Sequence, residues 1–210
     1  MKLERYDYNG RKNRLVVRMP TGVHELFIDG VEDAIRSQLK LIRNGSDRAA
    51  LFAQKVRPAR STEVCFQVDD APPGTTSKHE PDASFWHKDA RFPGVIIEVA
   101  YSQKRKRLGR LAEDYLLDSN ASVQVVVGLD IEYGKKGSRK ATLSVWRTHV
   151  VNTADGNELR VVQEVVDDVC PVLRHYSFFF TLTFFIGVPR RPRKPYRSSR
   201  PTTSAERLCL

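Results

Sequence analysis

Two acidic residues lie on segments that the sequence predicts to be neighbouring β-strands. Asp82 begins one segment, and Glu98 lies inside the apolar run from Val95 to Ala100. A Pro-Gly turn bounds this run, and its many β-branched residues are typical of a fully buried strand. An unpaired buried carboxylate is costly, so Glu98 should have a metal ion, a cation or a shared proton as its partner. If the two strands pair, Asp82 comes within reach of Glu98, and two converging carboxylates are typical magnesium ligands.

A plainer interpretation makes Asp82 an exposed turn residue and lets Glu98 pair with a nearby Lys or Arg. The apolar neighbours of Glu98 favour the metal site over this interpretation. A third acidic ligand has four candidates, between which the sequence does not choose: Glu25, Glu32, Glu63 and Glu80.

A basic cluster follows the predicted buried strand and consists of Lys104, Arg105, Lys106 and Arg107. Lys104 precedes Leu108 by four residues and Leu111 by seven, so it shares their inward helical face. From this face its ammonium group could reach the two carboxylates and offset negative charge that develops at a phosphate. The alternative is a solvated basic turn. As a surface that contacts phosphates, the cluster would bind nucleic acid without reading its sequence.

The elements around these residues alternate between helical and strand patterns, which predicts an α/β fold. One amphipathic helix is expected from Val23 to Ile42, with a break or kink near Asp29-Gly30, and a second from Ser102 to about Ser119. Val123 to Ile131 is too apolar to face water and is expected to be a central strand. The other expected strands are Glu63 to Val68, Asp82 to Trp86, Val95 to Tyr101, the half-exposed Thr142 to Trp146, and Leu159 to Val166.

This order of features resembles the restriction-endonuclease-like, or PD-(D/E)XK, nuclease superfamily, and is most similar to uncharacterised fungal members of it. The resemblance covers roughly residues 51–147. It rests on Pro81-Asp82, on Glu98-Val99-Ala100 sixteen positions later, and on the helix that contains Leu111 to Tyr115. It implies a restriction-endonuclease-like core of order α-β-β-β-α-β, in which a central mixed sheet is flanked by helices.

The resemblance also implies an activity, which is phosphodiester hydrolysis with Mg²⁺ or Mn²⁺. Asp82 and Glu98 would bind the metal together with the backbone carbonyl of Val99, and Lys104 would be the catalytic cation. The superfamily pattern has a lysine two residues after the second acid, where this chain has Ala100. The alternative is therefore a catalytically degenerate copy of the fold that binds nucleic acid or acts as an interaction module.

Composition places limits on the class of protein. The chain has 210 residues and a net charge of +10, which favours a polyanionic partner such as nucleic acid or an anionic membrane surface. Its three cysteines lack zinc or disulfide spacing, and its charged N-terminus lacks the apolar core of a signal peptide. These features predict an intracellular protein of the nucleus or cytoplasm rather than a secreted one.

The composition changes after Asp168, which divides the chain into a nuclease-like domain, 1–168, and a C-terminal extension, 169–210. The extension contains a Phe-rich segment, 176–188, of roughly thirteen residues, which is too short to span a bilayer as a helix. The segment 189–210 is rich in Pro, Arg and Ser and is expected to be disordered. A membrane-associated protein that uses the Phe-rich segment and the basic tail is a third interpretation.

Overall fold

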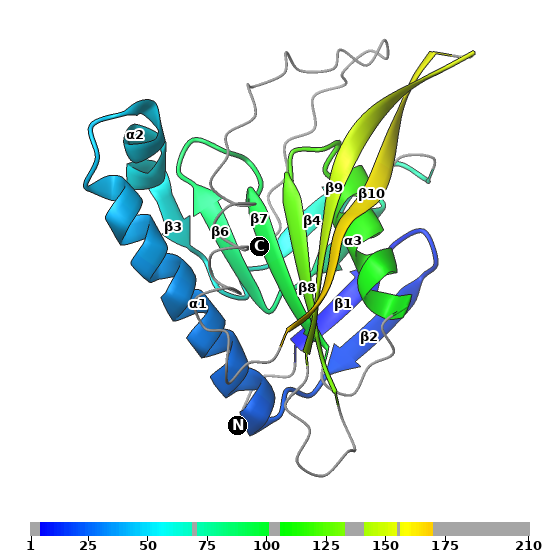
Figure 1. Ribbon diagram of the computed structural model, residues 1–210. Helices are drawn as coiled ribbons and strands as arrows, with labels where there is room; N and C mark the ends of the chain where they lie inside the picture. The colour runs from blue at the N-terminus through cyan, green and yellow to red at the C-terminus, as the bar shows by residue number, and fades with distance from the viewer. Residues whose placement is uncertain (1–4, 69–70, 101–105, 133–140, 155, 170–210) are drawn as a thin grey trace.

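A six-stranded sheet forms the centre of the molecule in the computed structural model (Figure 1), which describes residues 5–68, 71–100, 106–132, 141–154 and 156–169. Its strand order is β10-β9-β8-β7-β6-β3, and β7 and β8 are its one parallel pair. The mixed α/β class is therefore confirmed. The strand bounds are β3 (Val56–Pro58), β6 (Ala83–His87), β7 (Val95–Ala100), β8 (Val125–Ile131), β9 (Ala141–Thr153) and β10 (Gly156–Val169).

A smaller antiparallel sheet has the order β2-β1-β5-β4. Its strands are β1 (Arg5–Asn9), β2 (Arg14–Arg18), β4 (Val64–Gln67) and β5 (Thr76–His79). The β1–β2 hairpin turns at Gly10, where an added Cβ would lie 2.5 Å from the carbonyl oxygen of Thr76. Glycine is therefore required at this position, because the turn closely approaches the backbone of β5.

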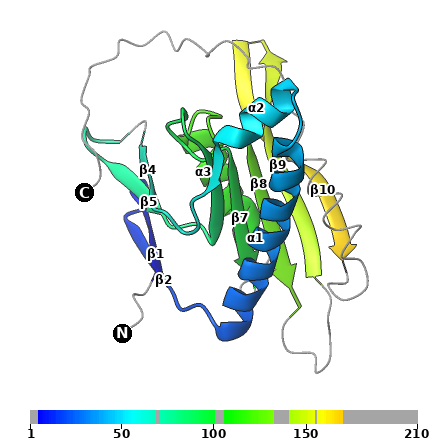
Figure 2. The same cartoon turned by 90° about the vertical axis from the view of Figure 1, so that its left-hand side faces the viewer.

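Helices cover both faces of the large sheet. The described residues contain α1 (Gly22–Arg43), α2 (Arg48–Lys55) and α3 (Lys106–Asp118), and α3 makes the crossover that a parallel β7–β8 pair needs. Figure 2 shows α1 on one side of the large sheet, and α3 with the small sheet on the other. The molecule is therefore layered, with the large sheet in the middle.

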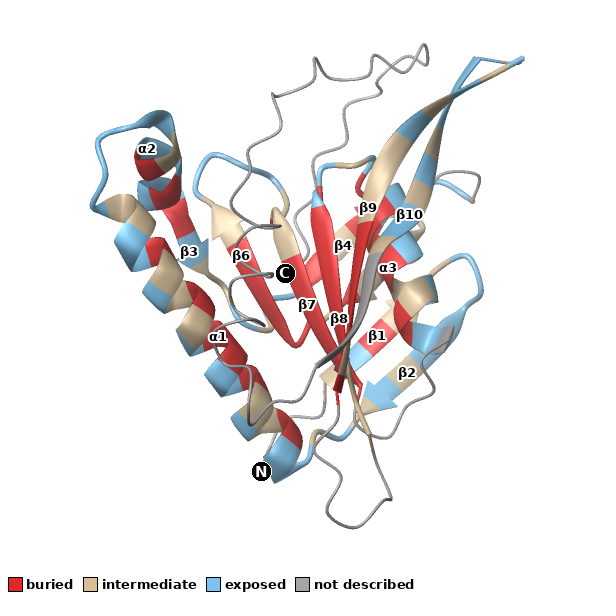
Figure 3. Cartoon of the chain, in the orientation of Figure 1, coloured by how far each residue is buried: buried red, intermediate tan, exposed pale blue. Residues whose placement is uncertain are grey.

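The side chains of β7 alternate between the two faces, as a pleated strand requires. Ile97 and Val99 pack in one core cluster with the apolar residues of α1, whereas Ile96 and Ala100 pack in another with those of α3. Figure 3 shows the resulting burial of β7 and β8. Glu98 alternates with Ile97 and Val99, so its side chain lies on the α3 face.

Several elements differ from the sequence-based expectations. Helix α1 runs without interruption through Asp29-Gly30, so the predicted break there is wrong; both residues are exposed and disturb no packing. The strand predicted at Glu63 to Val68 exists as β4, but it belongs to the small sheet, and β3 is the neighbour of β6. The strand predicted as half-exposed is largely buried, because Trp146 packs in the same cluster as α3.

The C-terminal extension cannot be compared with the structure. The Phe-rich segment and the basic tail lie in residues 170–210, outside the described residues. Among the helices that the structure describes, none is long and apolar enough to cross a membrane.

Candidate functional site

Asp82 and Glu98 meet at the end of the β6–β7 ladder. Ala83, the first residue of β6, is paired with Ile97 of β7, which places the preceding Asp82 beside Glu98. The backbone N–H of Val99 donates a hydrogen bond of 2.7 Å to Asp82 Oδ2. The Asp82 carboxylate thus accepts a hydrogen bond from the backbone of β7 just beyond the last paired residues of β6 and β7. Both side chains are buried, as expected for Glu98 and in contrast to the exposed interpretation of Asp82.

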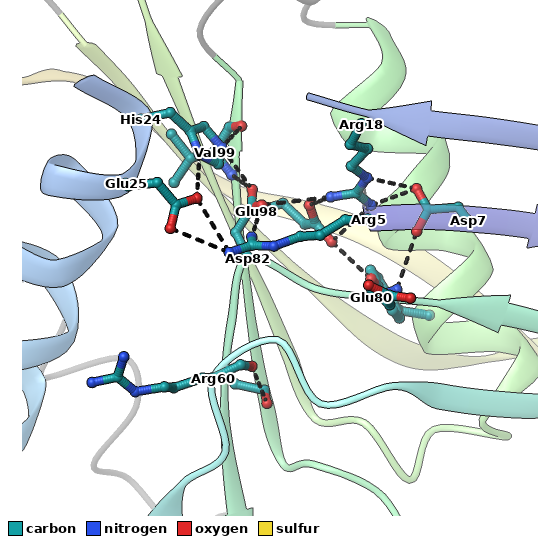
Figure 4. Close-up of polar contacts among 12 residues, drawn as sticks. Arg5, Asp7, Arg18, His24, Glu25, Arg60, Glu80, Asp82, Glu98 and Val99 are labelled. Carbon is teal, nitrogen blue, oxygen red and sulfur yellow. Dashed lines mark hydrogen bonds and ion pairs between the residues drawn. The ribbon is translucent and has the colours of Figure 1, made fainter. Parts of the chain in front are cut away.

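A single guanidinium group, that of Arg18 on β2, lies between the two carboxylates (Figure 4). Its Nη1 lies 2.7 Å from Glu98 Oε2 and 3.7 Å from Asp82 Oδ1. Its Nε donates a hydrogen bond of 2.7 Å to Asp7 Oδ2 on the neighbouring strand β1. Arg18 is therefore the cation that the two acidic residues share.

A second arginine, Arg5 on β1, contacts Asp82 from the side of α1. Its Nη1 donates to Asp82 Oδ1 at 3.2 Å, and its Nη2 donates to Glu25 Oε1 at 3.2 Å. Glu25 belongs to the first turn of α1. Arg5 thus connects the helix to the carboxylate pair.

Glu98 is held on its other side by Tyr115 of α3, whose hydroxyl donates a hydrogen bond of 2.7 Å to Glu98 Oε1. Burial raises the pKa of Glu98 to about 8, and the charge of Arg18 opposes this rise. Burial beside Glu98 also raises the pKa of Tyr115 well above its usual value. Burial therefore favours the protonated form of Glu98, whereas the neighbouring guanidinium of Arg18 favours the charged form.

His24 completes the site at the start of α1. Its Nε2 lies 3.3 Å from Asp82 Oδ2 and 3.2 Å from the carbonyl oxygen of Val99. The side chain of Thr21 caps the helix by accepting a hydrogen bond from the backbone N–H of His24, which holds His24 in the first turn of α1. Burial alone would lower the pKa of His24, but the neighbouring Asp82 carboxylate raises it overall.

The oxygen atoms at this site suit a hard cation such as Mg²⁺ or Mn²⁺, since they are two carboxylates and the Val99 carbonyl. Each carboxylate oxygen already has a partner within the protein: Arg5, Arg18, His24, the Val99 N–H or the Tyr115 hydroxyl. A metal ion shared by both acids must therefore displace Arg18 from Glu98. In the part of the chain that the structure describes, no group of three or more His, Cys, Asp or Glu side chains has the arrangement of a metal site.

The four candidates for a third acidic ligand differ in their distance from the site. Glu25 is joined to it through Arg5 and lies 3.5 Å from His24 Nδ1. Glu32 binds Arg36 on the next turn of α1. Glu63 and Glu80 both pair with Lys78. Among the four candidates, Glu25 is therefore the one that shares an arginine, Arg5, with Asp82.

The predicted basic cluster is described only in part. Lys104 and Arg105 lie outside the described residues, and Lys106 is the first residue of α3. Arg107 is exposed and belongs to the wall of a pocket that also includes Glu98. The expected approach of Lys104 to the carboxylates therefore stays a prediction.

The sequence analysis missed four residues of the site: Arg5, Asp7, Arg18 and His24. Three of them lie on the β1–β2 hairpin, which the analysis did not predict. A local signal was present, because Asn9-Gly10 between two segments of strand-forming residues is a strong hairpin pattern. No comparable signal marks His24, whose position on the buried face of α1 is shared with ordinary core residues.

No family model matches the chain, and no curated protein is significantly similar to it in sequence.

Proposed function

We propose that this chain is a metal-dependent nuclease of the PD-(D/E)XK type, in which Asp82 and Glu98 bind Mg²⁺ or Mn²⁺. One observation carries the proposal: two buried carboxylates, one just before β6 and one on the adjacent strand β7, converge on the same cation, the Arg18 guanidinium. A protein seldom buries two acids side by side, because each loses hydration and they repel one another. Functional sites are where such pairs are concentrated.

The order of elements supports the same proposal. Along the chain, α1 is followed by three strands of the large sheet, β3, β6 and β7, then by α3 and the parallel strand β8. These elements follow the order α-β-β-β-α-β that the resemblance implies for a restriction-endonuclease-like core, and α2, the small sheet, β9 and β10 are additional to it.

In the proposed mechanism, Asp82, Glu98 and the Val99 carbonyl would hold the metal ion, which would activate water and offset charge at the phosphate. Tyr115 orients the Glu98 carboxylate through its hydrogen bond. Arg18, if it were displaced from Glu98, would keep its contact with Asp7 and could face the phosphate as a cation. It could serve in place of the lysine that is missing at Ala100, a part for which Lys104 is the other proposed residue.

A catalytically degenerate protein that binds nucleic acid is the second candidate. Two observations favour it: Ala100 stands where the superfamily has lysine, and protein donors already satisfy all four oxygens of the Asp82 and Glu98 carboxylates.

A cleavage assay tests the two candidates. The full chain is incubated with labelled single- and double-stranded DNA and RNA, in Mg²⁺, in Mn²⁺ and in a chelator. A nuclease should cut only with metal, and Asp82→Asn or Glu98→Gln should each reduce the rate by roughly a hundredfold or more. Glu158→Gln, which removes an exposed carboxylate on β10, is the matched control and should cleave normally. Binding without cleavage in every metal would favour the degenerate protein.

A further inference from the structure

A pocket of about 110 Å³ lies between the β1–β2 hairpin and α3, and Glu98 and Val99 form part of its wall. The hairpin contributes Lys12, Arg14 and Arg18, and the helix contributes Arg107 and Arg110. The acidic residues of the wall are Asp7, Glu98 and Asp114, so cations are in excess. The pocket therefore favours an anion immediately beside the carboxylate pair.

Four of these cations are available to a ligand. Lys12, Arg14, Arg107 and Arg110 are exposed, and none forms an ion pair with any residue that the structure describes. Two of the acids, Asp7 and Glu98, are bound to Arg18 instead. The positive charge at the mouth of the pocket is thus not neutralised from within the described chain.

His79 joins the hairpin side of the pocket to α3. Its side chain is 2% exposed, it belongs to the pocket wall, and its ring packs against Tyr115 at a centroid distance of 5.1 Å. Its Nδ1 lies 3.7 Å from Asp7 Oδ1, so the acid of the pocket wall that it faces is Asp7. His79 therefore adds to the groups that offset the charge of Asp7.

We propose that the pocket binds one backbone phosphate of a nucleic acid and presents the adjacent phosphodiester bond to Asp82 and Glu98. The identity of the ligand rests on the proposed function. Arginine side chains match the oxygens of a phosphate with paired N–H donors, which suits Arg14 of the hairpin and Arg110 of α3. A volume of about 110 Å³ has room for a phosphate group.

Fluorescence anisotropy with a short labelled single-stranded oligonucleotide tests this inference. The measurement is made in a chelator, so that binding is separated from metal-dependent hydrolysis. Arg14→Gln and Arg110→Gln should each weaken binding roughly fivefold or more. Each should also reduce the salt-dependence slope by about 0.7, the value for one phosphate contact on a single strand. Arg48→Gln, an exposed arginine at the start of α2, is the matched control and should change neither quantity.

Two results would overturn the phosphate pocket: unchanged affinity and slope in both pocket variants, or an equal loss in Arg48→Gln. Complete competition by inorganic phosphate at the concentration of nucleotide phosphate would also overturn it, because the site would then bind free anions. If the protein cleaves nucleic acid but its pocket variants bind normally, only this inference is refuted. If the protein binds as predicted but does not cleave, only the proposed hydrolysis is refuted.

Discussion

At the scale of a single residue, Glu98 shows which features of the site could be predicted from the sequence. Its apolar neighbours predicted a buried carboxylate with a partner, and the structure confirms both its burial and a cation, Arg18. The identity of that cation could not be predicted, because Arg18 precedes Glu98 by 80 residues and reaches it only through the pairing of β1 and β2. Local patterns predict what a residue needs, whereas tertiary structure decides which residue provides it.

Protonation of Glu98 should make stability depend on pH. Its pKa is raised in the folded protein to about 8, so the folded state holds a proton that the unfolded chain has already lost. The stabilisation is complete below the ordinary pKa of about 4.5 and is lost as pH rises through about 8. His24, whose pKa is also raised, acts in the same direction.

Urea unfolding across this range, compared with Glu98→Gln, measures the contribution of Glu98. Wild-type stability should fall between about pH 5 and about pH 9, and the variant should show a shallower fall. Identical pH profiles for the two proteins would show that Glu98 does not titrate in this window.

Removal of Arg18 should be strongly destabilising. At about pH 9, where Glu98 is charged, Arg18→Gln leaves Asp7 and Glu98 buried without their shared cation, a change that typically costs about 3–5 kcal/mol of unfolding free energy. Arg160→Gln, which breaks an exposed pair with Glu158, should cost less than about 1 kcal/mol. Chemical denaturation of both variants provides the comparison. A similar loss of unfolding free energy in the two variants would show that the buried contacts of Arg18 stabilise the fold no more than the exposed pair does.

At the scale of elements, periodicity succeeded where each strand or helix buries a face of its own. The apolar spacing of α1 and the continuous apolar run of β8 predicted these elements, and the structure confirms them. No strand was predicted at β3, and the strand predicted at Glu63 to Val68 belongs to the small sheet, because the sequence does not show which partners such short strands have. The prediction that β9 is half-exposed was wrong for a related reason. The alternating sequence of β9 indicated one face in water, but α3 covers that face.

A substitution at Gly128 of β8 tests how closely β8 and β9 pack beside the site. It is paired with Glu98, and an added Cβ would lie 2.5 Å from Cζ3 of the buried Trp146 ring. Gly128→Ala should therefore lower the unfolding free energy by about 1–3 kcal/mol. Gly30→Ala in α1 meets open space and should instead raise it by about 0.5–1 kcal/mol. Thermal unfolding of the pair measures both effects, and a stabilised Gly128→Ala would refute the tight contact between β8 and β9.

At the scale of the whole molecule, the net charge of +10 indicated a polyanionic partner, but not where it would bind. The fold brings together, between the hairpin and α3, three arginines and a lysine that form no ion pair with the described residues, next to the buried acids. Neither the pocket nor the role of the hairpin could be predicted without the tertiary structure, because their residues come from distant parts of the chain. The predicted division of the chain at residue 168 stays a prediction.

Metal binding should stabilise the folded chain more in alkaline than in acidic solution. Mg²⁺ requires deprotonated carboxylates, and the pKa of Glu98 is raised to about 8. The rise in melting temperature with Mg²⁺ should thus be larger at about pH 9 than at about pH 6. Asp82→Asn should abolish the rise at both values. An equal rise at the two pH values would show that Mg²⁺ binds without displacing a proton from Glu98.

The most direct measurement is a crystal structure of the full chain with Mn²⁺, whose anomalous scattering marks the ion. The proposed function predicts one peak bound by the Asp82 and Glu98 carboxylates and the Val99 carbonyl, at oxygen distances of about 2.0–2.2 Å. It also predicts that the Arg18 guanidinium has moved away from Glu98 while it keeps its contact with Asp7. A Mn²⁺-saturated crystal without a peak at this pair, and with Arg18 still bound to Glu98, would contradict the metal-dependent nuclease.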